Sequence, residues 1–306
     1  MNGDETSCLL TLGHGYSAAA LARRLIPHGW HVIGSTRRDE KATMLEAEGV
    51  EPLRWPGDDA AAHTAIIRAS HVLISASPEP TADGGGVDPV LAGLGDALRA
   101  RGGGQGAGIR WIGYLSTTGV YGDRAGAWVD ETSTLETASP RGLARVAAER
   151  DWIAFGAETG IAVQIFRLAG IYGPGRGPFA KIKAGTARRI IKPGQVFSRI
   201  HVEDIAAVLE ASIAEPNPGA IYNVCDDEPA PPEDVLGHAA SLLGLPPPPE
   251  VAFDDAEMTP MARSFYMESR RVSNRRLRDE LGVTLSFPTY REGLAADLAT
   301  ERKAEA

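Results

Sequence analysis

The sequence is short of lysine and of cysteine. Only five of its 31 basic residues are lysine, the other 26 are arginine, and there are two cysteines. Cys8 and Cys225 both stand in apolar runs, so we expect buried thiols rather than a disulfide or a reactive site. No CxxC or paired-histidine spacing in the sequence suggests a metal. We therefore predict no metal site.

Long apolar runs and a surplus of positive charge are also absent. The acidic N-terminus is followed by no apolar stretch that would suit a signal peptide or a membrane helix. A net charge of −9 gives no general attraction to nucleic acid or to an anionic membrane. We expect a cytoplasmic protein, monomeric or homodimeric, that acts on a small molecule and has neither nucleic acid nor membrane as a partner.

Short apolar runs alternate with helical patterns in the first half of the chain. Predicted strands cover residues 8–12, 31–34, 50–53, 71–75, 109–116 and 162–168. Strands that alternate with helices indicate a parallel sheet with crossover helices, and their continuous apolar character suits burial on both faces. The predicted fold class is α/β, a doubly wound parallel (Rossmann) sheet, with a dinucleotide-binding domain over residues 1–169.

The regular alternation of predicted strands and helices ends after Gly170. Glycine and proline cluster there, and shorter helices are expected over 202–214, 232–243 and 274–281. This pattern indicates a smaller α/β substrate lobe over residues 170–306. We expect the lobe to return one strand, residues 220–224, to the main sheet.

The first predicted strand runs into a G-x-G-x-x-A turn that opens a helix. The first glycine permits the tight turn, the second lets a pyrophosphate approach the backbone, and the alanine keeps the helix close to the strand. The free amides of the helix N-terminus then face the phosphates. The turn consists of Gly13, His14, Gly15, Tyr16, Ser17 and Ala18. We predict that it binds a dinucleotide; the alternative is an ordinary glycine turn.

Arginine follows the second strand, where an acid would select NAD. Residues 35–38 read S-T-R-R, and the first acid is Asp39. Arginine can hold the 2′-phosphate of NADP, whereas a carboxylate would repel it. The expected cofactor contacts here and after the fourth strand are Thr36, Arg37, Arg38, Ser75 and Ala76. We expect NADP rather than NAD; two solvated arginines at a strand end are the alternative.

Further motifs follow the glycine turn in order. They are LSTTGVYG at 115–122, FRLAGIYGPGR at 166–176, RIHVEDI at 199–205, IYNV at 221–224, RVSN at 271–274 and LG at 281–282. Together they resemble the extended short-chain dehydrogenases/reductases, the superfamily of NAD-dependent epimerases and dehydratases. The resemblance covers residues 8–295. It implies an NAD(P)-dependent oxidoreductase or epimerase-like enzyme for a small carbonyl or hydroxyl substrate, sugar-like substrates included.

Enzymes of this family use a Ser or Thr together with a Tyr-x-x-x-Lys pair. The tyrosine exchanges a proton with the substrate oxygen while hydride moves to or from the nicotinamide, and the lysine lowers the pKa of the tyrosine and holds the ribose. The hydroxyl residue orients the substrate oxygen. By this resemblance its position falls on Thr117, with Ser116 and Thr118 beside it.

The Tyr-x-x-x-Lys pair itself is replaced. After Ser139 and Pro140 the chain reads R-G-L-A-R, so Arg141 and Arg145 occupy the two positions. Arginine keeps its proton near neutral pH. Arg145 can still hold a ribose hydroxyl, but Arg141 cannot act as the tyrosine does. The loss also resembles the atypical branch of the superfamily, which keeps the cofactor fold without the usual active-site residues.

Two tyrosines are candidates for a substitute proton donor. Tyr121 and Tyr172 each follow a sheet strand at the carboxyl edge, where ligands bind. Both can equally be packing aromatics. His201 titrates in a useful range, but it can instead organise the return of the chain from the second lobe.

The remaining candidates concern the substrate. Arg141 and Arg145 share one helix face and could form a cationic rim for an anion. The resemblance also places Phe197 where nucleotide-sugar enzymes often carry a phosphate-binding arginine. This difference weakens the case for a nucleotide-sugar as the substrate. The arginines of 270–278 are interpreted as a solvated helix face. The candidate substrate contacts are Thr118, Arg141, Arg176 and His201.

Two functional hypotheses follow. The first is an NADP-dependent enzyme in which Thr117 orients the substrate oxygen, Arg145 holds the ribose, and Tyr121 or Tyr172 donates the proton. The second is a non-catalytic NADP(H)-binding redox sensor or regulatory scaffold, suggested by the loss of both members of the pair.

Overall fold

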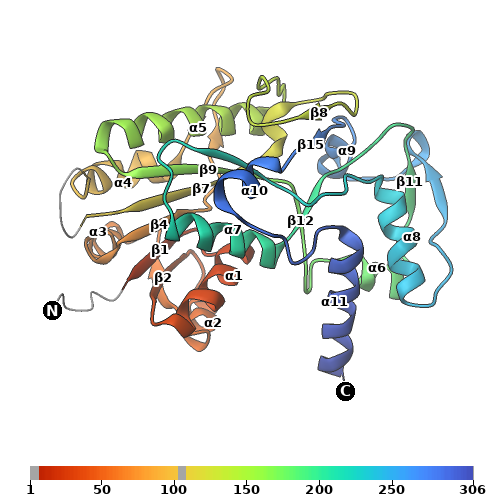
Figure 1. The fold of residues 1–306 in the computed structure, drawn as a ribbon, viewed down its shortest axis with the longest axis horizontal. Coiled ribbons are helices and arrows are strands. Elements are labelled where there is room, and N and C mark those ends of the chain that lie inside the picture. Colours follow the sequence, from red (N-terminus) through yellow and green to blue (C-terminus); the bar gives the residue numbers. More distant parts are fainter. Residues whose placement is uncertain (1–6, 103–107, 306) are drawn as a thin grey trace.

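A seven-stranded parallel sheet forms the centre of the protein. The computed structural model describes residues 7–102 and 108–305, so the acidic N-terminus at 1–6 lies outside it. The strand order is β13-β9-β7-β4-β1-β2-β3 (Figure 1). In chain order the strands are β1 (Cys8–Leu12), β2 (His31–Thr36), β3 (Glu51–Arg54), β4 (His71–Ile74), β7 (Trp111–Thr117), β9 (Ala162–Leu168) and β13 (Ile221–Val224). This arrangement confirms the predicted doubly wound sheet.

Helices cover both faces of the sheet. On one face α1 (Tyr16–Leu25) packs against α7 (Val202–Ala214), with α2 (Asp39–Ala47) beside them. On the other face lie α3 (Asp59–Arg68), α4 (Pro89–Arg99) and α5 (Pro140–Thr159). The strand order reverses between β1 and β4, and such a switch point is where α/β sheets bind ligands.

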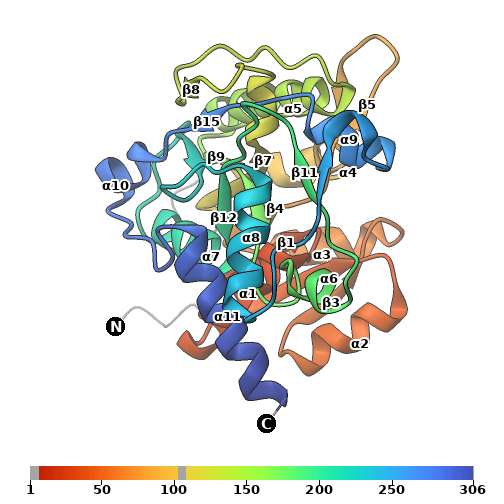
Figure 2. The same ribbon diagram turned by 90° about the vertical axis from the view of Figure 1, so that its right-hand side faces the viewer.

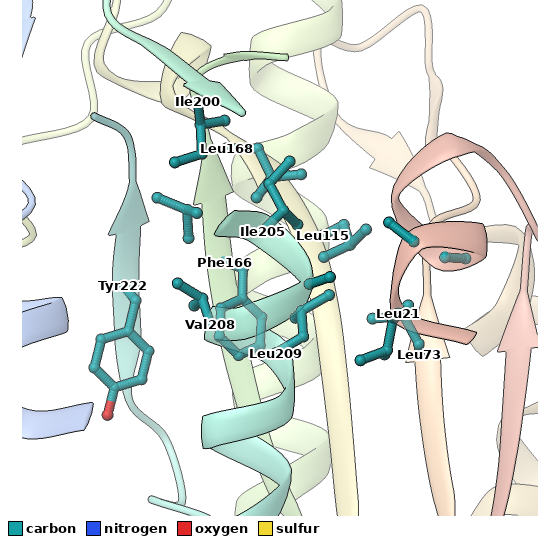
Figure 3. Close-up of a cluster of buried hydrophobic side chains, with 14 of the residues drawn as sticks. Leu21, Leu73, Leu115, Phe166, Leu168, Ile200, Ile205, Val208, Leu209 and Tyr222 are labelled. Atoms are coloured by element: carbon teal, nitrogen blue, oxygen red, sulfur yellow. The ribbon is translucent and has the colours of Figure 1, made fainter. Parts of the chain in front are cut away.

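Apolar side chains fill the layer between the sheet and each set of helices. Leu73, Leu115 and Phe166 point from the strands toward Val208 and Leu209 of α7 (Figure 3). Burial of this apolar area is the main source of stability. Cys8 and Cys225 are both buried and free, which confirms the predicted thiols.

Helix α5 carries the two arginines in its first two turns and has well-defined ends. Ser139 caps the helix, because its side chain accepts a hydrogen bond from the Gly142 amide. Pro140 occupies the first helical position, and Gly160 ends the helix in the left-handed conformation. This places Arg141 and Arg145 on one face, one turn apart.

Much of the chain after β9 builds a smaller lobe, at the right of Figure 1. Its helices are α6 (Phe179–Lys183), α8 (Pro232–Leu242), α9 (Pro260–Phe265) and α11 (Tyr290–Glu305), and α8 lies beside α11 (Figure 2). Helix α10 (Arg275–Leu281) instead packs near the centre, against β13 and α7. Two-stranded pairs join β10 (Gly170–Tyr172) to β12 (Arg199–His201), β11 (Arg189–Ile191) to β14 (Glu250–Ala252), and β8 (Trp128–Val129) to β15 (Arg271–Val272). A hairpin of β5 (Glu79–Pro80) and β6 (Gly86–Val87) projects from the loop after β4.

The lobe also returns to the main sheet. The predicted strand is present as β13, which pairs in parallel with β9. Helix α7 belongs to the main layer as well, so the proposed division near residue 170 stays a prediction. Within residues 7–102 and 108–305 no helix combines the length and apolar character that a membrane span requires.

Candidate functional site

The glycine turn joins β1 to α1 at the switch point of the sheet. Gly13 has a φ of +94°, and a Cβ there would lie 2.8 Å from the Ala76 amide nitrogen. The Gly13 amide donates to Ser35 Oγ (2.7 Å), and the His14 amide donates to the Ser35 carbonyl (3.1 Å). Gly15 precedes α1 without a side-chain cap, which leaves the first helical amides for a ligand. The turn therefore fits a pyrophosphate.

His14 points into the protein, away from this surface. Its side chain is 1% exposed, and Nδ1 lies 2.7 Å from Thr11 Oγ1. Burial lowers the pKa of His14 to about 4, with a smaller effect of the Lys41 charge, so the imidazole is neutral at pH 7. Any contact of His14 with a dinucleotide must use its backbone.

Three cations gather where β2 ends. Arg37 and Arg38 are exposed, as predicted from their position after the strand. Lys41 donates a hydrogen bond to the His14 carbonyl, and burial together with the charge of Arg38 lowers its pKa. Sequence reasoning missed Lys41, although it is one of only five lysines and stands in the first turn of α2.

The nearby acid Asp39 is offset by a cation of its own. Its carboxylate lies 3.2 Å from Arg54 Nη1 on β3. Thr36 is buried, and its hydroxyl accepts a hydrogen bond from the Arg38 amide (3.2 Å). The net charge at this edge of the sheet is therefore positive.

Tyr16 connects the glycine turn to the second lobe. Its hydroxyl donates to the Pro174 carbonyl (2.9 Å), and the Arg176 guanidinium lies over its ring at 5.7 Å. A Cβ on Gly173, whose φ is +147°, would lie 2.6 Å from the Tyr16 hydroxyl. Arg176, predicted as a substrate contact, thus lies beside the start of α1.

Of the three hydroxyl residues after β7, only Thr117 is half-exposed. Its Oγ1 accepts from the Gly119 amide (3.1 Å) and begins the 3₁₀ helix η2 (Thr118–Tyr121). Ser116 is buried and donates to Glu149 Oε1 (2.5 Å), and Thr118 is buried as well. Thr117 is therefore the hydroxyl available to a substrate.

A buried polar network occupies the place where Tyr121 was expected to act. The Arg167 guanidinium forms an ion pair with Glu149 (2.8 Å) and donates to the Tyr121 hydroxyl (2.9 Å). That hydroxyl donates in turn to Asn223 Oδ1 (2.7 Å). Tyr121 is 0% exposed, and burial raises its pKa to about 12. The structure therefore contradicts Tyr121 as the substitute proton donor.

Tyr172 and His201 serve the second lobe. Tyr172 is buried, its hydroxyl faces the Thr289 carbonyl (3.4 Å), and burial raises its pKa. His201 caps α7, because Nδ1 accepts from the Glu203 amide, while Nε2 lies 3.1 Å from Asp297 on α11. Neither side chain is free for a substrate, so both predicted roles are corrected.

Arg145 is fixed at the carboxyl edge by neutral acceptors. Nη1 donates to the Leu115 carbonyl (2.6 Å) and to the Tyr114 hydroxyl (3.1 Å), and Nη2 donates to Ser77 Oγ (3.0 Å). Ser77 follows β4, just after the predicted contacts Ser75 and Ala76. The half-buried guanidinium bridges the ends of β4 and β7, a place that suits contact with a cofactor ribose.

Arg141 remains available one turn earlier. It is exposed, and within residues 7–102 and 108–305 it forms no ion pair or hydrogen bond. The flank of the helix beside it is closed by the β5–β6 hairpin. A Cβ on Gly86 would lie 2.5 Å from the Cα of Ala144, so the hairpin rests directly on the α5 backbone.

Arg270 reaches the same edge from the second lobe, and the sequence did not reveal it. Its Nη1 donates to the Gly122 carbonyl (2.6 Å) and pairs with Glu268 (2.7 Å), and its side chain is 15% exposed. The predicted solvated helix face is wrong at this residue, because α10 begins only at Arg275. No group of three or more metal-ligating side chains comes together within the described ranges.

Comparisons with known proteins assign the chain to a family. The model of the NAD dependent epimerase/dehydratase family matches residues 96–225. Protein YeeZ of Escherichia coli is 31% identical over 259 residues, which are 78% of this chain and 84% of that protein. A 3-diazoavenalumate denitrifying reductase from Streptomyces is 31% identical over 154 residues, 46% of this chain and 49% of that protein.

A solved structure is more similar still. It is a functionally unknown conserved protein from Silicibacter pomeroyi, 56% identical, with a TM-score of 0.88 over 96% of this chain and 99% of that one. The family match and the two long similarities agree with the sheet order and the glycine turn. The chain therefore belongs to the NAD-dependent epimerase/dehydratase family of extended short-chain dehydrogenases/reductases, whose cofactor is a nicotinamide dinucleotide.

Proposed function

We propose that the protein is an NADP-dependent reductase of a small carbonyl substrate in which no tyrosine donates the proton. The observation that carries this proposal is the cation group of Arg37, Arg38 and Lys41 beside the glycine turn. Of the two acids in the first turn of α2, Asp39 is paired with Arg54, and Glu40 is exposed. The cations Arg37, Arg38, Lys41 and Arg54 still outnumber these acids, so a 2′-phosphate would find a surplus of positive charge at this edge.

The other parts of the site suit reduction better than epimerisation. A reduced nicotinamide supplies a hydride to an electron-poor carbon. Thr117 would donate its hydroxyl hydrogen bond to the substrate oxygen, and Arg145 would stabilise the negative charge that develops there.

Water would supply the proton. Five of the seven tyrosines are buried, namely Tyr114, Tyr121, Tyr172, Tyr222 and Tyr290. The oxygen left negative after hydride addition takes a proton from water, which leaves hydroxide. Oxidation and epimerisation need a base that removes a hydroxyl proton, and an arginine cannot be that base near neutral pH. The Streptomyces relative is likewise named a reductase.

A binding titration tests the cofactor preference. NADPH and NADH would be titrated into the parent protein and into Lys41→Ala and Arg38→Ala. The control is Arg99→Ala, which removes an exposed arginine of α4 far from β2. We expect each of the first two variants to lose about tenfold in NADPH affinity, as for one charge-assisted hydrogen bond. NADH binding should be unchanged; equal parent affinities for both cofactors would contradict the proposal.

A non-catalytic NADP(H)-binding sensor is the second candidate, favoured by the burial of Tyr121 and Tyr172. It predicts tight cofactor binding, no NADPH oxidation with any member of a broad carbonyl panel, and association with another macromolecule that changes with the cofactor. NADPH oxidation that disappears in Thr117→Ala would decide for the reductase. Association that is equal with and without saturating cofactor would exclude the sensor.

A further inference from the structure

Two guanidinium groups contact the chain close to Thr117. Arg145 of α5 donates to the carbonyl of Leu115, two residues before Thr117. Arg270 comes from the second lobe, and its Nη2 lies 3.9 Å from the position that a Cβ on Gly119 would occupy, two residues after Thr117. The Gly119 amide is itself bonded to Thr117 Oγ1. The accessible hydroxyl of the site therefore belongs to a short segment that two fixed cations contact.

Arg270 is held in place by groups that leave one of its nitrogens unused. Nη1 donates to the Gly122 carbonyl and to Glu268, and the Glu268 backbone is held by Gln195, whose Nε2 donates to its carbonyl (2.7 Å). Gln195 is buried. For Nη2 no hydrogen-bond partner occurs among residues 7–102 and 108–305. The guanidinium is thus oriented before any ligand arrives, and its unused edge faces the Thr117–Gly119 turn.

The charge around Thr117 favours an anion. The buried carboxylate of Glu149 is taken by Arg167, and that of Glu268 by Arg270. Arg145 has only neutral acceptors, and Arg141 has none. In the loop after η2, Asp123 accepts hydrogen bonds from the Ser269 and Ala125 amides, and Glu136 pairs with Arg124. Arg145 and Arg141 therefore bring positive charge without a carboxylate partner, and Arg270, although Nη1 pairs with Glu268, keeps Nη2 for a carboxylate or phosphate.

We propose that Arg270 is a substrate-binding residue and that the substrate carries an anionic oxygen group, a carboxylate or a phosphate. Nη2 of Arg270 holds this group, and Arg145 faces it from the cofactor side, while the hydroxyl of Thr117 donates to the substrate carbonyl oxygen. The proposal rests on the proposed reductase, because it concerns the substrate of that same site. It adds the chemical class of the substrate and a residue from the second lobe that distinguishes acids from neutral analogues.

The test uses matched pairs of small carboxylic acids and their primary amides, such as pyruvate with pyruvamide and benzoate with benzamide. Phenyl phosphate is included to separate phosphate from carboxylate. Each compound is titrated calorimetrically into full-length protein saturated with NADP⁺. We expect at least one acid or the phosphate to bind about tenfold or more tightly than its neutral analogue, the scale of a charge-assisted hydrogen bond. Amides that bind as well as their acids, or no anion that binds at all, would overturn the proposal.

The variants assign the preference to Arg270. Arg270→Gln should abolish the preference for the anion. Glu268→Gln, which removes only the pairing carboxylate, should keep it. Arg275→Gln is the control, because Arg275 is an exposed arginine that pairs with Asp279 within α10. A preference that survives in Arg270→Gln would contradict the inference.

The affinity for NADP⁺ is measured in each variant as well. An unchanged value in Arg270→Gln excludes misfolding as the cause of a lost preference. Failure of the parent to prefer NADP⁺ over NAD⁺ would count against the proposed function alone, since the acid and amide titrations can be repeated with either cofactor.

Discussion

The glycine turn after β1 and the polar cluster after β7 lie at the same edge of the sheet but are built differently. The turn uses backbone amides and a conformation that Gly13 adopts at +94°. The cluster uses side chains, several of which are taken up by buried partners such as Arg167 and Glu149. A site that depends on backbone amides tolerates changes of side chain, whereas a site that depends on particular side chains does not. The following predictions test this contrast, from the largest expected effect to the smallest.

The buried pair behind β7 should matter most for stability. Replacing Glu149 with leucine leaves the Arg167 charge buried without a partner and removes the acceptor of Ser116. We expect the free energy of unfolding to fall by about 3–5 kcal/mol, measured by denaturant titration. The double variant with Arg167→Leu should recover much of this loss. A single variant as stable as the parent would show that the cluster is not structural.

The turn should make stability sensitive to acid. The pKa of His14 falls from 6.5 to about 4 on folding because of burial, so the unfolded chain binds more protons between these values. Stability attributable to His14 is present above pH 6.5 and is lost as the pH falls toward 4, by about 3 kcal/mol in all. His14→Gln should flatten this part of the curve, whereas His63→Gln, at an exposed site, should not. Identical curves for parent and His14→Gln would contradict the assignment.

Gly13→Ala should combine two effects of replacing a glycine, backbone strain and a steric clash, which the control Gly29→Ala separates. The new Cβ would strain a left-handed residue and would collide with the backbone after β4. We expect a loss of about 2–3 kcal/mol and of dinucleotide binding, followed by denaturation and cofactor titration. Gly29 is the matched control, because it also has a positive φ but has nothing within 4 Å of a new Cβ. Gly29→Ala should cost about 1–2 kcal/mol and leave binding unchanged.

Tyr121→Phe should give the smallest effect. It removes hydrogen bonds with Arg167 and Asn223 inside the core but no group that a substrate can reach. We expect about 1–2 kcal/mol of lost stability and a kcat within about twofold of the parent. The contrast is with Thr117→Ala, which should lower kcat about a hundredfold by removing the hydrogen bond to the substrate oxygen. A large fall in kcat for Tyr121→Phe would restore it as a catalytic residue.

Features that depend on local sequence were predictable. The parallel sheet followed from the alternation of apolar runs with helical patterns, and the turn followed from the spacing of Gly13, Gly15 and Ala18. Helix α3 (Asp59–Arg68) was not predicted, because its sequence is rich in alanine and shows little apolar periodicity. In the structure only three of its residues are buried. Strand ends differed slightly, as for β7, which begins at Trp111 rather than at residue 109.

The roles of single polar residues were less accessible because their partners are distant in sequence. Tyr121 follows a strand at the ligand-binding edge, but its hydroxyl is claimed by Asn223, which is 102 residues away. Arg270 looked like part of a solvated run, yet it reaches Gly122, 148 residues before it. Such pairings are set by the fold as a whole. Only the arginines that begin α5 could be placed from sequence, since the cap at Ser139 and the helix fix them locally.

The close contact of Gly86 with Ala144 has a consequence for redesign of the site. The hairpin packs against the α5 backbone between positions 141 and 145, and it leaves no room for a side chain at position 86. The helix therefore presents positions 141 and 145 from a supported backbone, whichever side chains they carry. The pair Arg141→Tyr and Arg145→Lys would need no insertion and no change of backbone.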